Sequence, residues 1–200
     1  TIAETEGSTG VDESGSTDLF TVVLNAQPNS DVVFAISSSD TGEATVTSSL
    51  TFTSANWDTP QNVTVTGVDD DIIDGSQVST STISIIGAIS DDNFDAVADQ
   101  TVSVTTTDDD VAGFTIAETS GSTGVDESGS TDIFTVVLNA QPTTDVVLTI
   151  SSGDTGEATV TSSLTFTAAN WDTAQNVTVT GVDDDLIDGT ISSSITVAIN

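Results

Sequence analysis

Hydrophobic and polar residues alternate along most of this chain, in short runs that turn residues separate. Between residues 18 and 26, Phe20, Val22 and Leu24 fall on one face of an extended segment, and polar residues dominate the other. A period of two is typical of a strand with one buried face. In the first half of the chain we predict strands at 1–4, 18–26, 31–37, 43–46, 49–53, 61–68, 79–89 and 101–107. No run has the periodicity of a helix of useful length.

The same pattern occurs twice. Residues 1–75 align with residues 115–189 at an offset of 114, with ten differences in 75 positions. A repeat of this length corresponds to a whole domain and not to one turn of a solenoid. Short strands with turns every 8–12 residues or so predict an all-β fold of two tandem, immunoglobulin-like antiparallel β-sandwich domains. We place the first domain at residues 1–110 and the second at residues 111–200.

The second copy is shorter than the first. At the same offset, the counterpart of Thr107 would fall beyond Asn200. We therefore expect the second sandwich to lack its last strand in this chain. Two explanations stay open: a longer chain was cut at this point, or a neighbouring subunit donates the strand by edge addition.

The charge of the chain excludes several classes of function. It contains 32 acidic residues and no Lys, Arg or His, which gives a formal net charge of −32. Binding to nucleic acid depends largely on neutralising phosphates, and an anionic membrane would repel this chain. Without Cys, His, Lys or Tyr, most nucleophilic and acid–base chemistry is absent as well, so we predict that the protein is not an enzyme. A two-carboxylate glycosidase would need a cleft that short turns do not offer.

Many of the acidic residues are grouped in loops. Asp69, Asp70, Asp71 and Asp74 follow one predicted strand, and the run 108–110 leaves the last strand of the first copy. Carboxylates a few Å apart repel one another by about 1 kcal/mol per pair even in water. Calcium is bound by six to eight oxygen ligands, mainly carboxylates and carbonyls. We predict Ca²⁺ at the junction of the two copies; the alternative is that each run is a solvated turn, which we also expect for the loop 91–95.

Several motifs together resemble the Calx-beta domain family. They are Val11-Asp12-Glu13, Leu50-Thr51-Phe52, the segments 61–65 and 69–75, and the closing aspartates 108–110. That family includes regulatory calcium-binding domains of sodium–calcium exchangers and tandem repeats of large bacterial surface proteins. The resemblance implies calcium ligands at Glu13, Asp40, Asp69, Asp70, Asp74, Asp108, Asp109 and Asp110 in the first copy, and at Glu127, Asp154, Asp183, Asp184 and Asp188 in the second. The last residues of the two loop triplets, Asp71 and Asp185, complete the candidate set.

These observations predict a structural role. We expect a calcium-rigidified repeat that acts as a spacer in an extracellular stalk, adhesin or surface filament, secreted or displayed on a bacterial cell. Its partners would be neighbouring repeats of the same chain or identical subunits, with no nucleic acid and no membrane insertion. Two alternatives are a calcium-sensing regulatory domain and a filament subunit that a neighbour completes with a donated strand.

Overall fold

The computed structural model describes residues 1–187 and 189–200. Two compact units form within it: unit 1 comprises residues 1–70 and 74–109, and unit 2 comprises residues 71–73 and 110–200. Each unit has a hydrophobic core of its own. Asp188, one of the predicted ligands, lies outside the described residues.

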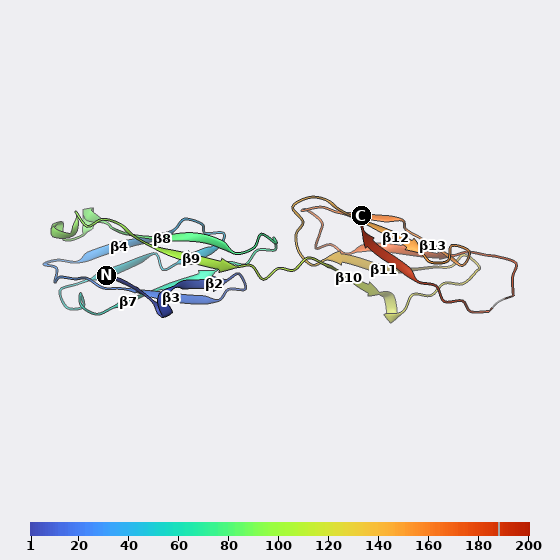
Figure 1. The fold of residues 1–200 in the computed structure, drawn as a ribbon, viewed down its shortest axis with the longest axis horizontal. Coiled ribbons are helices and arrows are strands. Elements are labelled where there is room, and N and C mark those ends of the chain that lie inside the picture. The colour runs from blue at the N-terminus through green and yellow to red at the C-terminus, as the bar shows by residue number, and fades with distance from the viewer. Residues whose placement is uncertain (188) are drawn as a thin grey trace. The chain divides into compact units, whose positions relative to one another are not determined.

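Unit 1 is a β-sandwich of two sheets (Figure 1). One sheet has the strand order β1-β3-β7-β5, and the other has the order β2-β9-β8-β4-β6. The strands are β1 (Ile2–Glu4), β2 (Thr9–Asp12), β3 (Thr17–Val22), β4 (Val32–Ser38), β5 (Ala44–Val46), β6 (Ser49–Phe52), β7 (Gln61–Gly67), β8 (Gln77–Ile85) and β9 (Gln100–Thr107). The eight predicted strands of the first copy are therefore confirmed, with ends that differ by a few residues.

The core of unit 1 follows the alternation of the sequence. Val32, Phe34 and Ile36 of β4 are buried. Val102 and Val104 of β9, a strand of the same sheet, are buried as well. Such side chains lie on one face of their strands because successive residues of a strand point to opposite sides. Burying each of them stabilises the unit by about 1.5–3 kcal/mol relative to exposure.

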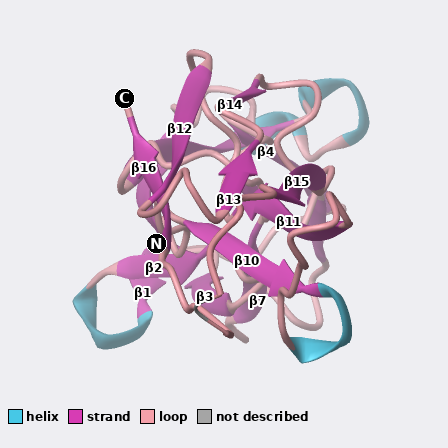
Figure 2. Ribbon diagram, turned by 90° about the vertical axis from the view of Figure 1, so that its right-hand side faces the viewer, coloured by secondary structure: helices cyan, strands magenta, loops and turns pink. Residues whose placement is uncertain are grey.

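Helical structure in the described part of the chain is limited to single 3₁₀ turns (Figure 2). They are η1 (Thr5–Gly7), η2 (Gly87–Ile89), η3 (Asp92–Phe94) and η4 (Thr119–Gly121). Among residues 1–187 and 189–200, no helix has the length and apolar character needed to cross a membrane. These turns connect strands. The two cores are formed mainly by side chains of the sheets.

Strand β2 is an element that the sequence pattern did not predict. The alternation pointed to a loop around the glycines at 7, 10 and 15, but residues 9–12 pair with β9 in parallel, Thr9 opposite Val104 and Asp12 opposite Thr107. All other strand pairs of unit 1 are antiparallel. A four-residue strand whose partner lies more than 90 residues away carries little local signal. Its pairing brings the residue after β2, Glu13, to the end of β9.

The loop at residues 91–95 differs from the prediction at one residue. Asp91 is 4% exposed instead of solvated. Its Oδ2 accepts hydrogen bonds from the backbone N–H groups of Asn29 (2.6 Å) and Ser30 (3.2 Å), and its Oδ1 accepts one from Asn93. These hydrogen bonds, with that of Asn93 first, hold the pKa of Asp91 below its ordinary value. Asp91 therefore links two distant loops, while Asn93 and Asp95 are exposed.

Unit 2 repeats this architecture with fewer strands. Its sheets have the orders β10-β11-β15-β13 and β14-β12-β16. The strands are β10 (Phe114–Glu118), β11 (Thr131–Leu138), β12 (Val146–Ser152), β13 (Ala158–Val160), β14 (Ser163–Phe166), β15 (Gln175–Gly181) and β16 (Ile195–Ile199). Strand β16 takes the place of β8, and in the described part of unit 2 no strand corresponds to β9, as predicted.

Candidate metal centre

Glu13 is the most buried acidic residue of the described chain, with 1% of its surface exposed. It directly follows β2, and its backbone N–H donates to the carbonyl oxygen of Thr107 (3.1 Å) at the end of β9. No hydrogen bond reaches its side-chain atom Oε2. Burial, and then the nearby charges of Asp108 and Asp70, raise the pKa of Glu13 to about 7. The fold thus holds a carboxylate in a position that is unfavourable without a positive partner.

Glu43 is a second buried carboxylate at this end of unit 1. It immediately precedes β5, is 9% exposed, and its Oε2 likewise has no hydrogen-bond partner. Its main-chain carbonyl accepts a hydrogen bond from Val68 N–H (2.9 Å), which attaches it to the end of β7. Burial, followed by the charges of Asp74 and Asp40, raises the pKa of Glu43. The charge of Glu43 also contributes to the raised pKa of Glu13, after those of Asp108 and Asp70, and the charges of Asp70, Asp74 and Asp108 act on both glutamates.

Glu43 is not among the ligands predicted from the sequence. A signal was present, because only seven of the 32 acidic residues are glutamates and both Glu13 and Glu43 recur at the offset of 114. Glu43 was assigned to a strand, where a single acid is ordinarily a solvent-facing residue. Its burial arises from strand pairing, since Ala44 lies opposite Gly67 in the sheet.

The aspartate triplets contribute alternate residues to this cluster. Of the first triplet, Asp70 is half-buried while Asp69 and Asp71 are exposed; of the second, Asp109 is exposed while the residues on either side of it are half-buried. In extended backbone, side chains i and i+2 share a side, which explains why the triplets divide in this way. Within unit 1, one carboxylate oxygen of Glu13 and one of Asp70 lie within 4.8 Å of each other.

Asp108 holds the acidic loop against the end of β9. Its Oδ2 accepts a hydrogen bond from Gly75 N–H (2.7 Å). Gly75 has a φ of +73°, a conformation that glycine adopts without steric cost. The side-chain amide of Gln77 donates to the carbonyl of Asp74 (3.1 Å) and closes the same loop. This arrangement keeps Asp70, Asp74 and Asp108 near enough to Glu13 to raise its pKa.

Asp40, another of the predicted ligands, lies in the turn before β5. It is exposed, and its Oδ1 accepts a hydrogen bond from Gly42 N–H (3.0 Å) within the turn before β5. Its carbonyl accepts a hydrogen bond from Ala44 N–H (3.2 Å). Asp40 therefore shapes the turn that positions Glu43 and adds negative charge to its surroundings.

The composition of this centre suits a hard divalent cation. Its donors are carboxylate oxygens, and the chain has no Cys or His for a zinc site. No basic side chain exists anywhere in the sequence to neutralise the cluster. The two buried glutamate oxygens that lack hydrogen bonds are the feature that distinguishes it from a solvated acidic turn.

The predicted ligands of the second copy that the structure describes are less closely gathered. Glu127 is half-buried, and Asp183 and Asp185 are exposed. Asp184 Oδ1 accepts a hydrogen bond from Leu186 N–H (2.7 Å), and Asp154 Oδ1 accepts one from Gly156 N–H (3.0 Å), so both stabilise turns. Among the residues that the structure describes in unit 2, no three acidic side chains converge as they do around Glu13.

Comparison with known proteins yields structural likenesses only. No family model matches the chain, and no curated protein matches it. Similar solved structures include CBD12 from CALX1.2 (14% identity, 98% of this chain and 79% of that one, TM-score 0.39) and the calcium binding domain CBD12 of CALX1.1 (14%, 99% and 80%, TM-score 0.40). Another is the S-layer protein SbsC, domains 5-6 (16%, 98% and 88%, TM-score 0.34). Likenesses at this level carry no argument about function.

Proposed function

We propose that the acidic end of unit 1 binds Ca²⁺ and that the bound ion stiffens the chain where it leaves this unit. The observation that carries the proposal is the buried Glu13 side chain, whose Oε2 has no hydrogen-bond partner and which has a carboxylate oxygen within 4.8 Å of one of Asp70. An ion at this point would neutralise the cluster and satisfy the buried oxygen in one step.

The proposed ligands connect a loop of the sandwich to the chain that exits it. Glu13 and Asp70 lie in loops of unit 1, whereas Asp108, whose charge also acts on Glu13, lies on the segment that follows β9. Coordination by both groups would restrict the backbone torsions of that segment. A repeated unit with such a restricted exit suits a spacer in an extracellular stalk, adhesin or filament, where calcium is millimolar and weak sites are filled. This role needs no catalysis.

Calcium should stabilise unit 1 against heat, because a ligand that binds only the folded state adds to its stability. At 10 mM Ca²⁺ and a Kd of about 10⁻⁴–10⁻³ M, the gain is about 1.5–3 kcal/mol. That corresponds to a rise in Tm of roughly 5–15 °C for a domain of this size. Trp57 packs against the core of unit 1, so its fluorescence in a Trp171→Phe background reports the melting of this unit.

Two variants make this measurement specific. Glu13→Gln keeps the size of the side chain but removes the charge, and should abolish most of the calcium-dependent shift. Glu6→Gln is the matched control, because Glu6 is exposed and outside the cluster, and it should retain the full shift. Equal Tm values with calcium and with chelator in the unmodified chain would exclude the metal centre.

Stiffening is tested separately by small-angle X-ray scattering. With calcium, the scattering should indicate a narrow range of maximum dimensions for the chain. With chelator, that range should be wider. Glu13→Gln should behave in calcium as the unmodified chain does in chelator. Identical scattering in both conditions would contradict a mechanical role even where melting shows that calcium binds.

A further inference from the structure

The peptide bond between Asp74 and Gly75 is held by hydrogen bonds on both of its sides. These two exposed residues lie in the irregular loop before β8. The carbonyl oxygen of Asp74 accepts a hydrogen bond from the side-chain amide of Gln77 (3.1 Å), and Gly75 N–H donates to Asp108 Oδ2 (2.7 Å). A donor at the carbonyl polarises the whole amide group and makes its N–H more acidic. The carboxylate at the N–H is then a ready acceptor for the amide proton.

Gly75 leaves its backbone nitrogen open to the side chain of Asp74. A Cβ at this position would meet no atom within 4 Å, so the space around the residue is free. Bond formation between the Gly75 nitrogen and Asp74 Cγ closes a five-membered ring, and glycine offers no side chain that opposes the approach. Because both reacting atoms belong to adjacent residues, the reaction needs no encounter with a second molecule. The loop therefore contains a nucleophile, an acyl carbon and a proton acceptor in one place.

The charge of Asp74 is unfavourable to its neighbours when no cation is bound. After burial, this charge is the largest cause of the raised pKa of Glu43, and it also acts on Glu13. Both glutamates are buried and have an oxygen without a hydrogen-bond partner. Since repulsion between carboxylates is mutual, a reaction that removes the charge of Asp74 relieves both of them. Closure of the ring removes that charge.

We propose that Asp74 and Gly75 form a self-modification site, at which the metal-free chain converts Asp74 into isoaspartate through a cyclic imide. The Gly75 nitrogen bonds to Asp74 Cγ and gives its proton to Asp108 Oδ2. One carboxyl oxygen of Asp74 leaves as water, with that proton and one from the solvent. Water then opens the imide at either of its two carbonyls. Opening at the main-chain carbonyl leaves Gly75 attached to the former side-chain carbon, which gives isoaspartate; opening at the other carbonyl restores Asp74.

Calcium should protect this site, a step that rests on the proposed function. Asp74 and Asp108 are both among the predicted ligands, and a bound ion would hold the oxygens that the reaction uses. If only the metal-free chain reacts, its rate falls by the factor 1 + [Ca²⁺]/Kd, about 10–100 at 10 mM Ca²⁺ and a Kd of about 10⁻⁴–10⁻³ M. Isoaspartate adds one carbon atom to the backbone and displaces the carboxylate. A chain that has been without calcium would thus keep a covalent record of it.

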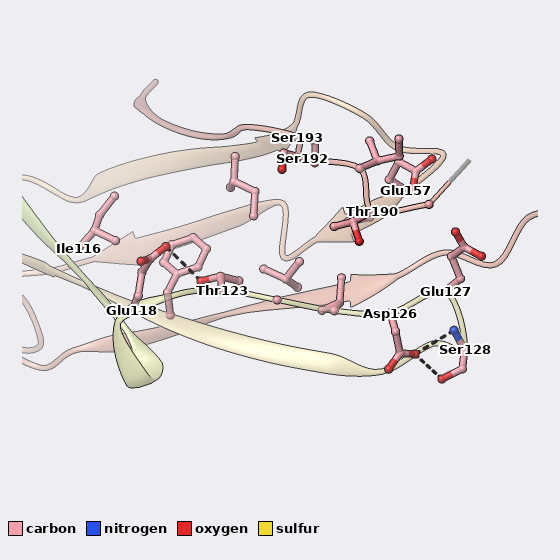
Figure 3. A pocket seen from close by; sticks show the side chains of 18 of the residues that line it. Ile116, Glu118, Thr123, Asp126, Glu127, Ser128, Glu157, Thr190, Ser192 and Ser193 are labelled. Carbon is pink, nitrogen blue, oxygen red and sulfur yellow. Dashed lines mark hydrogen bonds between the residues drawn. The ribbon is translucent and has the colours of Figure 1, made fainter. Parts of the chain in front are cut away.

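The second copy has the same dipeptide at residues 188 and 189. Asp188 lies outside the described residues, so the inference concerns unit 1. Figure 3 shows Glu127 and Glu157, the counterparts of Glu13 and Glu43, at one end of the pocket that it draws, where Thr190 also lies. Modification at residue 74 therefore has to be measured separately from modification at residue 188.

Peptide mapping of the unmodified 200-residue chain tests the inference. The chain is incubated at neutral pH in 10 mM Ca²⁺ or in chelator, and a synthetic peptide of residues 70–78 is incubated beside it. Chymotrypsin cleaves after aromatic residues and Leu, so it releases residues 74 and 188 in different peptides, and electron-transfer dissociation distinguishes isoaspartate from aspartate. In chelator, isoaspartate should form at residue 74 at least about tenfold faster in the folded chain than in the peptide, because only the fold supplies Asp108. In calcium the rate should fall about 10–100-fold.

Three variants assign the reacting groups. Asp74→Glu keeps the charge but would require a six-membered ring, and should abolish the modification. Asp108→Asn keeps the size of the side chain but removes the proton acceptor, and should slow the reaction in chelator at least about tenfold. Asp58→Glu is the control, because Asp58 is exposed and outside the cluster, and it should leave the rate unchanged. Circular dichroism shows whether each variant folds, and the unmodified chain is decisive in either case.

The outcomes separate the modification from the metal. Absence of isoaspartate at residue 74 in chelator would overturn the proposal, and so would a rate no higher in the folded chain than in the peptide. Equal rates in calcium and in chelator would support the modification site and exclude Asp74 from the metal centre. The calcium-dependent rise in Tm shows separately whether unit 1 binds the ion.

Discussion

Metal-free unit 1 should lose about 3 kcal/mol of unfolding free energy as the pH rises from about 4.5 to about 7. Glu13 causes this loss, because burial and neighbouring carboxylates raise its pKa from 4.5 to about 7. Below pH 4.5 the side chain is protonated in both the folded and the unfolded protein. Between the two pKa values only the folded state holds the proton, so raising the pH favours unfolding.

The other groups with shifted pKa values do not hide the loss of stability between pH 4.5 and 7. The raised pKa of Glu43 acts in the same direction as that of Glu13. Asp12 and Asp91 have lowered pKa values, so their contributions are present above about pH 4 and are lost only at lower pH. With calcium present, the free energy of unfolding should instead increase with pH above pH 5, since calcium binds the ionised carboxylates.

Urea unfolding of the Trp171→Phe chain, followed by Trp57 fluorescence in metal-free buffer, measures the effect. Glu13→Gln should reduce the loss of stability between pH 4.5 and 7 to the part that Glu43 contributes, and Glu6→Gln should preserve the full loss. A metal-free unit 1 whose stability increases over this interval would show that Glu13 ionises without cost in the folded protein.

Gly67→Ala should destabilise unit 1 by about 3 kcal/mol or more, as severe overpacking does. A Cβ on Gly67 would lie 2.0 Å from the carbonyl oxygen of Asp12 and 2.8 Å from its carbonyl carbon. Both contacts are with backbone, which cannot move aside as a flexible side chain can. Strand β2 would be forced away from β7, and Glu13 would be displaced with it. The calcium-dependent rise in Tm should therefore disappear together with the stability.

Gly10→Ala is the matched control, because its Cβ would meet Thr105 O at an ordinary distance of 3.6 Å. Thermal melting followed at Trp57 should show a change within roughly 0.5 kcal/mol for this variant. Gly181→Ala should act on unit 2 as Gly67→Ala acts on unit 1, since its Cβ would lie 2.0 Å from Asp126 O. A Gly67→Ala chain that keeps its Tm and its calcium response would contradict this account.

Local patterns predicted most strands and the residues of the core. Alternation at Val32, Phe34 and Ile36 marks the buried face of β4, and the same alternation marks β9. The repeat predicted a second sandwich of the same kind, because only ten of 75 positions differ between the two copies. These features depend on neighbouring residues in the chain or on simple comparison of one copy with the other.

The metal centre was predictable only in part. The clustered aspartates indicated a site near Glu13. The sequence pattern did not show which members of each triplet are buried and which are exposed. In the structure Asp70 turns inward while Asp69 and Asp71 face solvent. Glu43 was missed because its burial results from pairing at the end of β7. The direction of the backbone at each position determines which carboxylates come together. That direction cannot be inferred from composition.

The sequence by itself determined the all-β fold, the duplication and an excess of negative charge that no side chain of the protein can neutralise. Only the tertiary structure decided that β2 runs parallel to β9 and that Glu13 and Glu43 are buried at one end of unit 1. The physical reason is the range of the contacts involved. Alternation and charge are local properties, whereas these features come from pairing between segments more than 20 residues apart.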